Sequence, residues 1–462
     1  MRTRNRLALE TVVALAATLG FIAVRPAAAQ PDQAGEALSA RDLVKLAEEV
    51  EKEVEALRGW KFKRPVKKDV RSEKQLRAYI EKKVFEEEYG QGRLECLQVM
   101  LPMIGLIPAD CDLKQTFMDV LFNQIGGFYD PDSGAFYLLQ RGGVDYGPLV
   151  NRILIAHELT HALDDQHVDL NRLIKSREPT EDWTLAVGAV VEGSATTLMT
   201  RYSVRALLSG KYDLTELMQV VESETERSQA FLEAPPYFTA LAANYMCGMT
   251  FLLRGNFMAL AADPEHKGVG DDFLATVKDP PQSSEQILHP DKYWNADERD
   301  EPVVVKDEDV ERLLRQPGLH VVHKNTMGEL LCALLTFPAD RKLDLNLMML
   351  PSYWTNEAAT GWGGDRFFLL AAGKDCQTAR KQLKDVRGVW LTMWDTPRDR
   401  NEFIEDYATA RKLPARRHFK RGALAVFLFG FDSRQAAEFE DHFLETLPAF
   451  RHGDKPWFPR PR

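Results

Sequence analysis

The chain has 462 residues and a formal net charge of −10, and 45% of its residues are hydrophobic against 28% that are charged. This mixture is that of a globular protein and excludes a disordered or collagen-like chain; the acidic balance argues against nucleic acid as a partner, which needs a basic protein face. The length exceeds what one hydrophobic core usually supports and predicts two or three domains.

Residues 1–29 have the pattern of a secretory signal peptide. Three arginines precede an uncharged run at 11–24, and an Ala-Ala-Ala cleavage site follows at 27–29. The run is shorter than the roughly 20 residues that span a bilayer. We therefore expect export to the periplasm or the cell exterior, with an uncleaved anchor as the alternative and no stable membrane span after cleavage. Cleavage removes four arginines and one glutamate, which takes the net charge from −10 to −13.

Apolar periodicity and turn residues predict mainly helices before residue 340. Helices are expected at 39–57, 72–88, 112–124 and 148–163, from residue 180 onward, and over much of 212–335. A weakly alternating segment at 62–70 is a candidate strand. Two aromatic runs flank the segment DPDSG at 130–134, whose turn chemistry predicts a β-hairpin at 127–139.

The pattern changes after Pro338. Strands are expected at 366–371, 388–394 and 422–431, and helices at 398–411 and 433–447. This change divides the mature chain into a domain at 30–340 and a C-terminal α+β module at 341–462 of unknown role. The predicted fold class is α+β and mainly helical.

The five cysteines all lie in the mature part of the chain. Cys96 and Cys111 flank a segment rich in proline and glycine, and we expect them to form a disulfide bond. Cys247 and Cys332 lie in apolar helical patterns and are expected to be buried free thiols. An odd number of cysteines leaves at least one thiol unpaired.

The sequence His157-Glu158-Leu159-Thr160-His161 is an H-E-x-x-H motif in a predicted helix. Side chains four residues apart lie on one face of a helix, so the two imidazoles can bind one zinc ion. The glutamate beside them can take a proton from water as a general base. The motif therefore predicts a catalytic zinc site.

A catalytic zinc ion needs a third protein ligand, and two residues compete for that role. His167 has the spacing of the longer H-E-x-x-H-x-x-G-x-x-H pattern, but Asp164 replaces its glycine and adopts the left-handed conformation less readily. Glu192 lies in a second apolar helix, where a lone carboxylate is costly unless it is paired or metal-bound. Gly193 and Ala195 would let that helix approach the first closely. Glu192 is the favoured ligand and His167 the alternative.

Asp164 and Asp165 follow the motif by about one helical turn. Either carboxylate could accept a hydrogen bond from a ligand imidazole and so determine its tautomer. A pair of solvated carboxylates near the end of the helix is the alternative, and the sequence does not decide between them.

The H-E-x-x-H motif with a downstream helical glutamate resembles the gluzincin branch of the zincin metallopeptidases. Longer segments resemble an uncharacterised group of exported bacterial and archaeal zincin-like proteins: HELTHALDDQHVDL, VVEGSA, GGFYDPDSGAFYL, SSEQILHPDKY, NTMGELL and GWGGDRF. The resemblance covers most of the mature chain, and only the zinc motif is mechanistically specific. It implies a small twisted sheet beside the active-site helix, whose edge strand binds an extended substrate. The hairpin at 127–139 is the candidate for that strand.

The resemblance also implies the roles of individual residues. His157, His161 and Glu192 would be the zinc ligands, and Glu158 would be the general base and then the acid that protonates the leaving amine. Such enzymes usually add a tyrosine or histidine that stabilises the oxyanion.

His289 and Tyr293 are the candidates for that additional catalytic role. Pro290 is expected to hold His289 in an extended loop rather than inside a helix. A purely structural loop that packs an aromatic side chain is the alternative.

These observations lead us to expect an exported zinc metallopeptidase that hydrolyses peptide or protein substrates. One alternative is a catalytically inactive zincin-fold protein that acts as a binding scaffold in the cell envelope, although the intact Glu158 argues against it. The other is a metal hydrolase that acts on a non-peptide bond.

Overall fold

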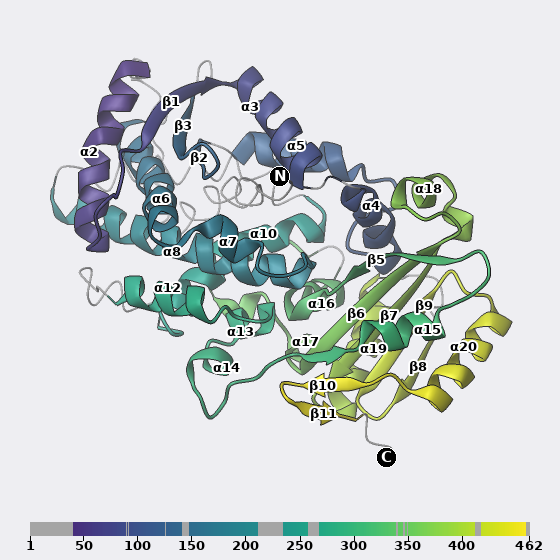
Figure 1. Ribbon diagram of the computed structural model, residues 1–462. Coiled ribbons are helices and arrows are strands. Elements are labelled where there is room, and N and C mark those ends of the chain that lie inside the picture. The colour runs from purple at the N-terminus through teal and green to yellow at the C-terminus, as the bar shows by residue number, and fades with distance from the viewer. Residues whose placement is uncertain are drawn as a thin grey trace.

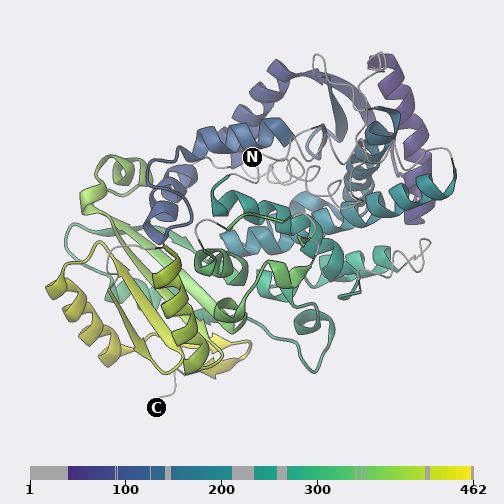
Figure 2. The ribbon, with the colours of Figure 1, turned by 180° about the vertical axis from the view of Figure 1, so that it is seen from behind.

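The computed structural model describes residues 40–458 except 89, 91, 125, 141–146, 211–233, 257–267, 339–340, 345–346, 349 and 412–416. The predicted signal peptide and part of the predicted helical region 212–335 lie outside the described residues. The described part is a mainly helical α+β fold with small sheets, as the sequence predicts (Figures 1 and 2). In this part, no helix combines the length and apolar character that crossing a bilayer requires.

The helices are, in chain order, α2 (Ala40–Arg58), α3 (Glu73–Ile80), the π-helix η1 (Glu81–Glu88), α4 (Arg93–Ile104), α5 (Leu113–Gln124), α6 (Gly147–Val168), α7 (Leu170–Ile174), α8 (Glu181–Leu208), α10 (Pro236–Leu252), α12 (Val269–Lys278), α13 (Ser284–Leu288), α14 (Asp291–Trp294), α15 (Asp307–Leu313), α16 (Gly328–Thr336), η2 (Pro351–Tyr353), α17 (Glu357–Thr360), α18 (Cys376–Lys381), η3 (Leu383–Asp385), α19 (Pro397–Arg411) and α20 (Ser433–Thr446). The strands are β1 (Lys67–Ser72), β2 (Gly127–Asp130), β3 (Ala135–Gln140), β4 (Val303–Val305), β5 (His320–Asn325), β6 (Trp362–Ala371), β7 (Arg387–Trp394), β8 (Arg417–Arg421), β9 (Leu424–Phe429), β10 (Phe450–His452) and β11 (Lys455–Trp457).

A three-stranded sheet in the order β1-β3-β2 lies beside α6 (Figure 1). The predicted hairpin is confirmed: β2 and β3 pair in antiparallel register, and the turn between them includes Gly134 with φ of 62°. Only glycine adopts this left-handed conformation without steric cost. β1 pairs with β3 in parallel, so β2 is an edge strand of the sheet.

A hydrophobic cluster joins this sheet to α2, α6 and α8. Its members from α2 and α6 recur at helical spacing, as the sequence predicts: Leu43, Val50, Val54, Leu57, Ile153, Leu154, Leu159 and Leu163. Tyr129 and Phe136 of the hairpin complete it. Helix α2 therefore belongs to the core that supports α6.

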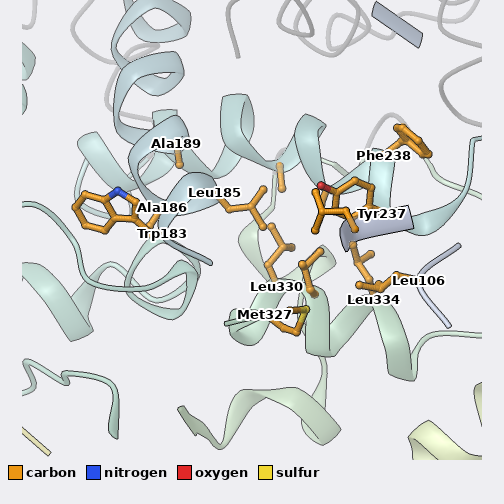
Figure 3. Close-up of a cluster of buried hydrophobic side chains, with 14 of the residues drawn as sticks. Leu106, Trp183, Leu185, Ala186, Ala189, Tyr237, Phe238, Met327, Leu330 and Leu334 are labelled. Carbon is orange, nitrogen blue, oxygen red and sulfur yellow. The ribbon is translucent and has the colours of Figure 1, made fainter. Parts of the chain in front are cut away.

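Helices α8 and α10 run side by side, and α16 joins them to the C-terminal part (Figure 3). The close-up shows Leu185 of α8 next to Leu330 of α16, with Tyr237 of α10 in the same hydrophobic cluster. The α8–α10 pair thus positions the middle of α8, which carries Glu192.

The C-terminal part contains a five-stranded antiparallel sheet in the order β5-β6-β7-β9-β8. The strands predicted at 366–371, 388–394 and 422–431 correspond to β6, β7 and β9, and the two predicted helices to α19 and α20. Alternate residues of β6 and β7 belong to two separate cores, one shared with α19 and the other with α15 and α20. Both faces of the sheet are therefore covered by helices.

Two strands that precede residue 340 pair with strands that follow it. β5 lies next to β6, and β4 pairs with β10, to which β11 is added. The sheets of the C-terminal part thus begin before residue 340 in the sequence. The division into domains at that residue stays a prediction.

The predicted disulfide bond between Cys96 and Cys111 is wrong. Cys96 is instead bonded to Cys376, with a Cα–Cα distance of 5.0 Å, and Cys111 is free. The reason is that α4 packs against α18, which brings together two cysteines 280 residues apart in sequence. The remaining two cysteines are buried and free, as predicted: Cys247 and Cys332.

Candidate metal centre

Helix α6 carries the H-E-x-x-H motif and continues to Val168, five residues beyond the predicted end. His157 and His161 lie one turn apart on it and are fully buried. Their Nε2 atoms are 3.1 Å apart, so both imidazoles point to the same place. The apolar remainder of α6 holds them there because it packs against α2 and the hairpin.

Helix α8 brings Glu192 to the same place. Its Oε2 atom lies 3.2 Å from His157 Nε2 and 3.3 Å from His161 Nε2, and Glu192 is also fully buried. Ligands of a tetrahedral zinc ion with bonds of 2.0–2.1 Å are roughly 3.3–3.4 Å apart. These three residues form a group whose donor atoms could bind one metal ion. The spacing and the donor types fit zinc.

The charge balance of this cluster also fits a bound cation. Burial raises the pKa of Glu192 to about 7, and it lowers the pKa of His161 to about 4 and that of His157 as well. The environment thus disfavours both a carboxylate and protonated imidazoles. A divalent cation bound to neutral imidazoles would supply the positive charge that Glu192 lacks.

Glu158 lies beside the cluster and is 2% exposed. Its Oε2 atom accepts a hydrogen bond of 2.9 Å from the backbone N–H of Tyr129 in β2. Burial raises the pKa of Glu158 well above its usual value, the charge of Glu192 adds to the rise, and the Tyr129 N–H opposes it. A carboxylate with a raised pKa is a stronger proton acceptor, which suits a general base.

Asp164 connects three helices around the cluster. Its carboxylate forms an ion pair of 2.7 Å with Arg58 of α2 and accepts a hydrogen bond of 2.6 Å from Ser194 of α8. The Nδ1 atoms of His157 and His161 have no hydrogen-bond partner in the described structure. Asp164 is therefore neither solvated nor bonded to a ligand imidazole, and it holds the helices that carry the ligands.

Gly193, which follows Glu192, packs against a different helix from the one that the sequence predicts. Gly193 faces α10 rather than α6: a Cβ atom on it would lie 2.2 Å from the backbone carbon of Gly248. A Cβ atom on Gly248 would in turn lie 2.0 Å from the carbonyl oxygen of Ala189. The glycines are needed because the backbones of α8 and α10 touch there.

Replacing Gly248 with alanine is expected to lower the free energy of unfolding by about 1–3 kcal/mol, because the added methyl group forces α8 and α10 apart. Chemical denaturation measures this loss. Gly270→Ala in α12 is the matched control, since its Cβ atom would lie 3.4 Å from the nearest atom, in the ring of Trp60. Equal stabilities of the two variants would contradict the close helix contact.

His167, the alternative third ligand, lies outside the cluster. Its Nε2 atom is 2.9 Å from the carbonyl oxygen of Lys61, and its ring stacks on Trp60 at a centroid distance of 4.7 Å. It lies near the end of α6, which continues as a helix where the longer zinc motif would turn back. The structure thus brings Glu192, and not His167, to the two histidines.

The two further candidates for catalysis have contacts elsewhere. His289 Nε2 lies 2.9 Å from Glu329 Oε1, and the Tyr293 hydroxyl donates to the carbonyl oxygen of Asp279 at 2.6 Å. His289 is non-helical before Pro290, as predicted, with φ of −122° and ψ of 79°. These contacts do not join either side chain to the group of His157, His161 and Glu192. Their catalytic roles stay predictions.

Tyr245 of α10 is a site residue that the sequence reasoning missed. Its ring centroid is 6.2 Å from that of His157, it is 1% exposed, and its side chain lowers the pKa of Glu192. The contact depends on the close approach of α8 and α10. Helix α10 contains two tyrosines, and its apolar sequence does not indicate which of them reaches the site.

The fold and the cluster together define a mainly helical α+β protein with a buried His–His–Glu group that could bind a metal ion. A family model described as a domain of unknown function (DUF8575) matches residues 315–426, which include the strands β5 to β8 and the beginning of β9. Comparison with curated proteins and with solved structures gives no match. The matched segment does not contain the group of His157, His161 and Glu192.

Proposed function

We propose that this protein is an exported zinc-dependent metallopeptidase that hydrolyses peptide bonds. The observation that carries the proposal is the triangle of His157 Nε2, His161 Nε2 and Glu192 Oε2, with sides of 3.1, 3.2 and 3.3 Å. Export rests on the signal-peptide pattern of the first 29 residues.

A peptide substrate is favoured by the sheet beside the site. In β2, the backbone groups of Gly127 and Tyr129 face away from β3, since Phe128 and Asp130 alternate with them in the ladder. The Tyr129 N–H binds Glu158, and an extended chain would pair with the Tyr129 carbonyl and with the backbone groups of Gly127. This edge would place a peptide backbone next to the general base.

The residues of the site have distinct roles in this reaction. His157, His161 and Glu192 would hold zinc, which supplies Lewis acidity that polarises the scissile carbonyl and lowers the pKa of water. Glu158 takes the proton from the attacking water and passes it to the leaving amine. The backbone N–H of Tyr129 orients the Glu158 carboxylate for both transfers.

Glu158→Gln is expected to lower kcat for peptide hydrolysis by about 10²–10⁴-fold while the protein keeps its zinc. Glutamine keeps the acceptor for the Tyr129 N–H but cannot take a proton. Elemental analysis of purified protein and digestion of a broad peptide library measure the two effects. Glu438→Gln on the exposed side of α20 is the control and should change neither.

Two results would overturn the proposal. Wild-type protein without stoichiometric zinc removes its basis, because the three ligands then serve another purpose. A Glu158→Gln variant that cleaves the library as fast as wild type would show that the hydrolysis arises elsewhere.

A further inference from the structure

A cavity of about 980 Å³ opens beside the C-terminal end of α6. Its walls come from the turn after β2, with Pro131 and Asp132, and from the end of α6 through α7, with Asp165 and Arg172. Its volume is sufficient for several residues of a peptide.

Tyr129 connects this cavity to the candidate metal centre. Its backbone N–H donates to Glu158, and its hydroxyl donates to Asp165, at 2.9 and 2.8 Å. Asp165 lines the cavity and follows His161 by one helical turn. A chain that pairs with β2 on the side opposite β3 would continue past Asp130 to Pro131, at the wall of the cavity. The end of such a chain would therefore reach the cavity.

Most of the carboxylate charge in the cavity wall already has partners. Asp132 forms an ion pair of 3.1 Å with Lys83, which lies outside the wall. Asp165 accepts from Tyr129 and from the backbone of Leu170, and burial raises its pKa. The carboxylate of Asp169 accepts from the backbone N–H of residue 172.

The cations of the wall are Arg64, Arg172 and Lys175. They equal in number the three carboxylates of the wall, Asp132, Asp165 and Asp169, while Lys83 outside the wall pairs with both Asp132 and Glu87. Arg172 is exposed, and within the described residues its guanidinium forms no ion pair. A guanidinium in a concave site binds carboxylates in a charge-assisted, often bidentate, manner.

We propose that this cavity is a subsite that binds a carboxylate of the peptide substrate, with Arg172 as its cationic partner. The inference rests on the proposed peptidase function and adds a substrate class to it. The carboxylate comes either from the C-terminus of the peptide or from an acidic side chain, and both have the same chemistry.

The test measures binding separately from cleavage. Fluorescently labelled random-sequence peptide pools are prepared in three forms: with a free C-terminus and acidic residues, with a C-terminal amide, and with Asn and Gln in place of Asp and Glu. Anisotropy titrations with full-length mature Glu158→Gln protein give the affinities. Removing the recognised carboxylate is expected to weaken binding by about 10–100-fold. The pool that loses affinity identifies the source of the carboxylate.

The Arg172→Gln substitution is made in the same Glu158→Gln background. It is expected to bring the ratio of the affinities for the charged and the neutral peptide pools close to one. Arg434→Gln on the exposed face of α20 is the matched control and should leave the ratio unchanged. Equal affinities of all three pools for the parent protein would overturn the inference. An Arg172→Gln variant that retains the full ratio would also overturn it.

The two proposals fail in different ways. If the protein cleaves peptides but shows no preference for a carboxylate, the subsite proposal is refuted and the peptidase proposal stands. If it binds carboxylate-bearing peptides preferentially but the wild-type protein does not cleave them, the peptidase proposal is refuted and the cavity remains an anion-binding site.

Discussion

Replacing Glu192 with alanine is expected to lower the zinc affinity of the protein by about two to three orders of magnitude. A structural zinc ion with four ligands contributes about 10–16 kcal/mol to the folding of a small domain, so one ligand accounts for roughly 2.5–4 kcal/mol. The Glu192 Oε2 atom lies 3.2–3.3 Å from both imidazoles and closes the triangle of donors. Competition with a fluorescent zinc chelator measures the change in Kd.

His167→Ala is the matched variant, because His167 competes with Glu192 for the third ligand position on sequence grounds. Its side chain binds the carbonyl oxygen of Lys61 and stacks on Trp60, so its loss should leave the zinc affinity unchanged. A lower zinc affinity in His167→Ala, with normal affinity in Glu192→Ala, would reverse the assignment.

Removal of a buried side chain can also unfold a protein, and a second variant separates the two effects. Glu192→Gln keeps the volume and one oxygen atom but removes the charge that binds a cation. It is expected to remain folded by circular dichroism and to bind zinc more weakly than wild type. Zinc bound as tightly by Glu192→Gln as by wild type would show that the carboxylate is not a ligand.

The parts of the fold that depend on neighbouring residues were predictable from the sequence. The DPDSG turn between aromatic runs requires a hairpin, and the spacing of Ile153, Leu154 and Leu159 requires a buried face on α6. The first two ligand candidates follow from the same local logic, since residues four apart share a helix face. Glu192 was identifiable because a lone carboxylate in an apolar helix demands a partner.

The parts that depend on distant segments were not predictable. Cys96 meets Cys376 only because α4 lies against α18, and nothing near Cys96 in the sequence carries that information. Tyr245 reaches the site for a similar reason, since the contact between α8 and α10 places it there. Motif spacing thus identifies ligands on one helix, whereas helix packing selects the residues that surround them.

Loss of the Cys96–Cys376 bond is expected to lower the free energy of unfolding by about 3–5 kcal/mol. The bond links residues 280 apart, and a disulfide that closes so long a loop removes much of the conformational entropy of the unfolded chain. It also joins α4 of the helical part to α18, which follows β6 of the five-stranded sheet. Guanidinium denaturation of wild type and Cys376→Ser, both under oxidising conditions, measures the difference.

Cys111→Ser is the matched control because Cys111 is a free thiol in the structure. Its replacement should change the free energy of unfolding little. Adding a reductant should destabilise wild type to the level of Cys376→Ser and leave that variant unchanged. A large loss of stability in Cys111→Ser would favour the pairing expected from the sequence instead. The proposed zinc ligands lie on α6 and α8, which the bond does not connect, so the zinc affinity of the folded Cys376→Ser variant should equal that of wild type. This combination separates a bond that stabilises the fold from one that shapes the metal centre.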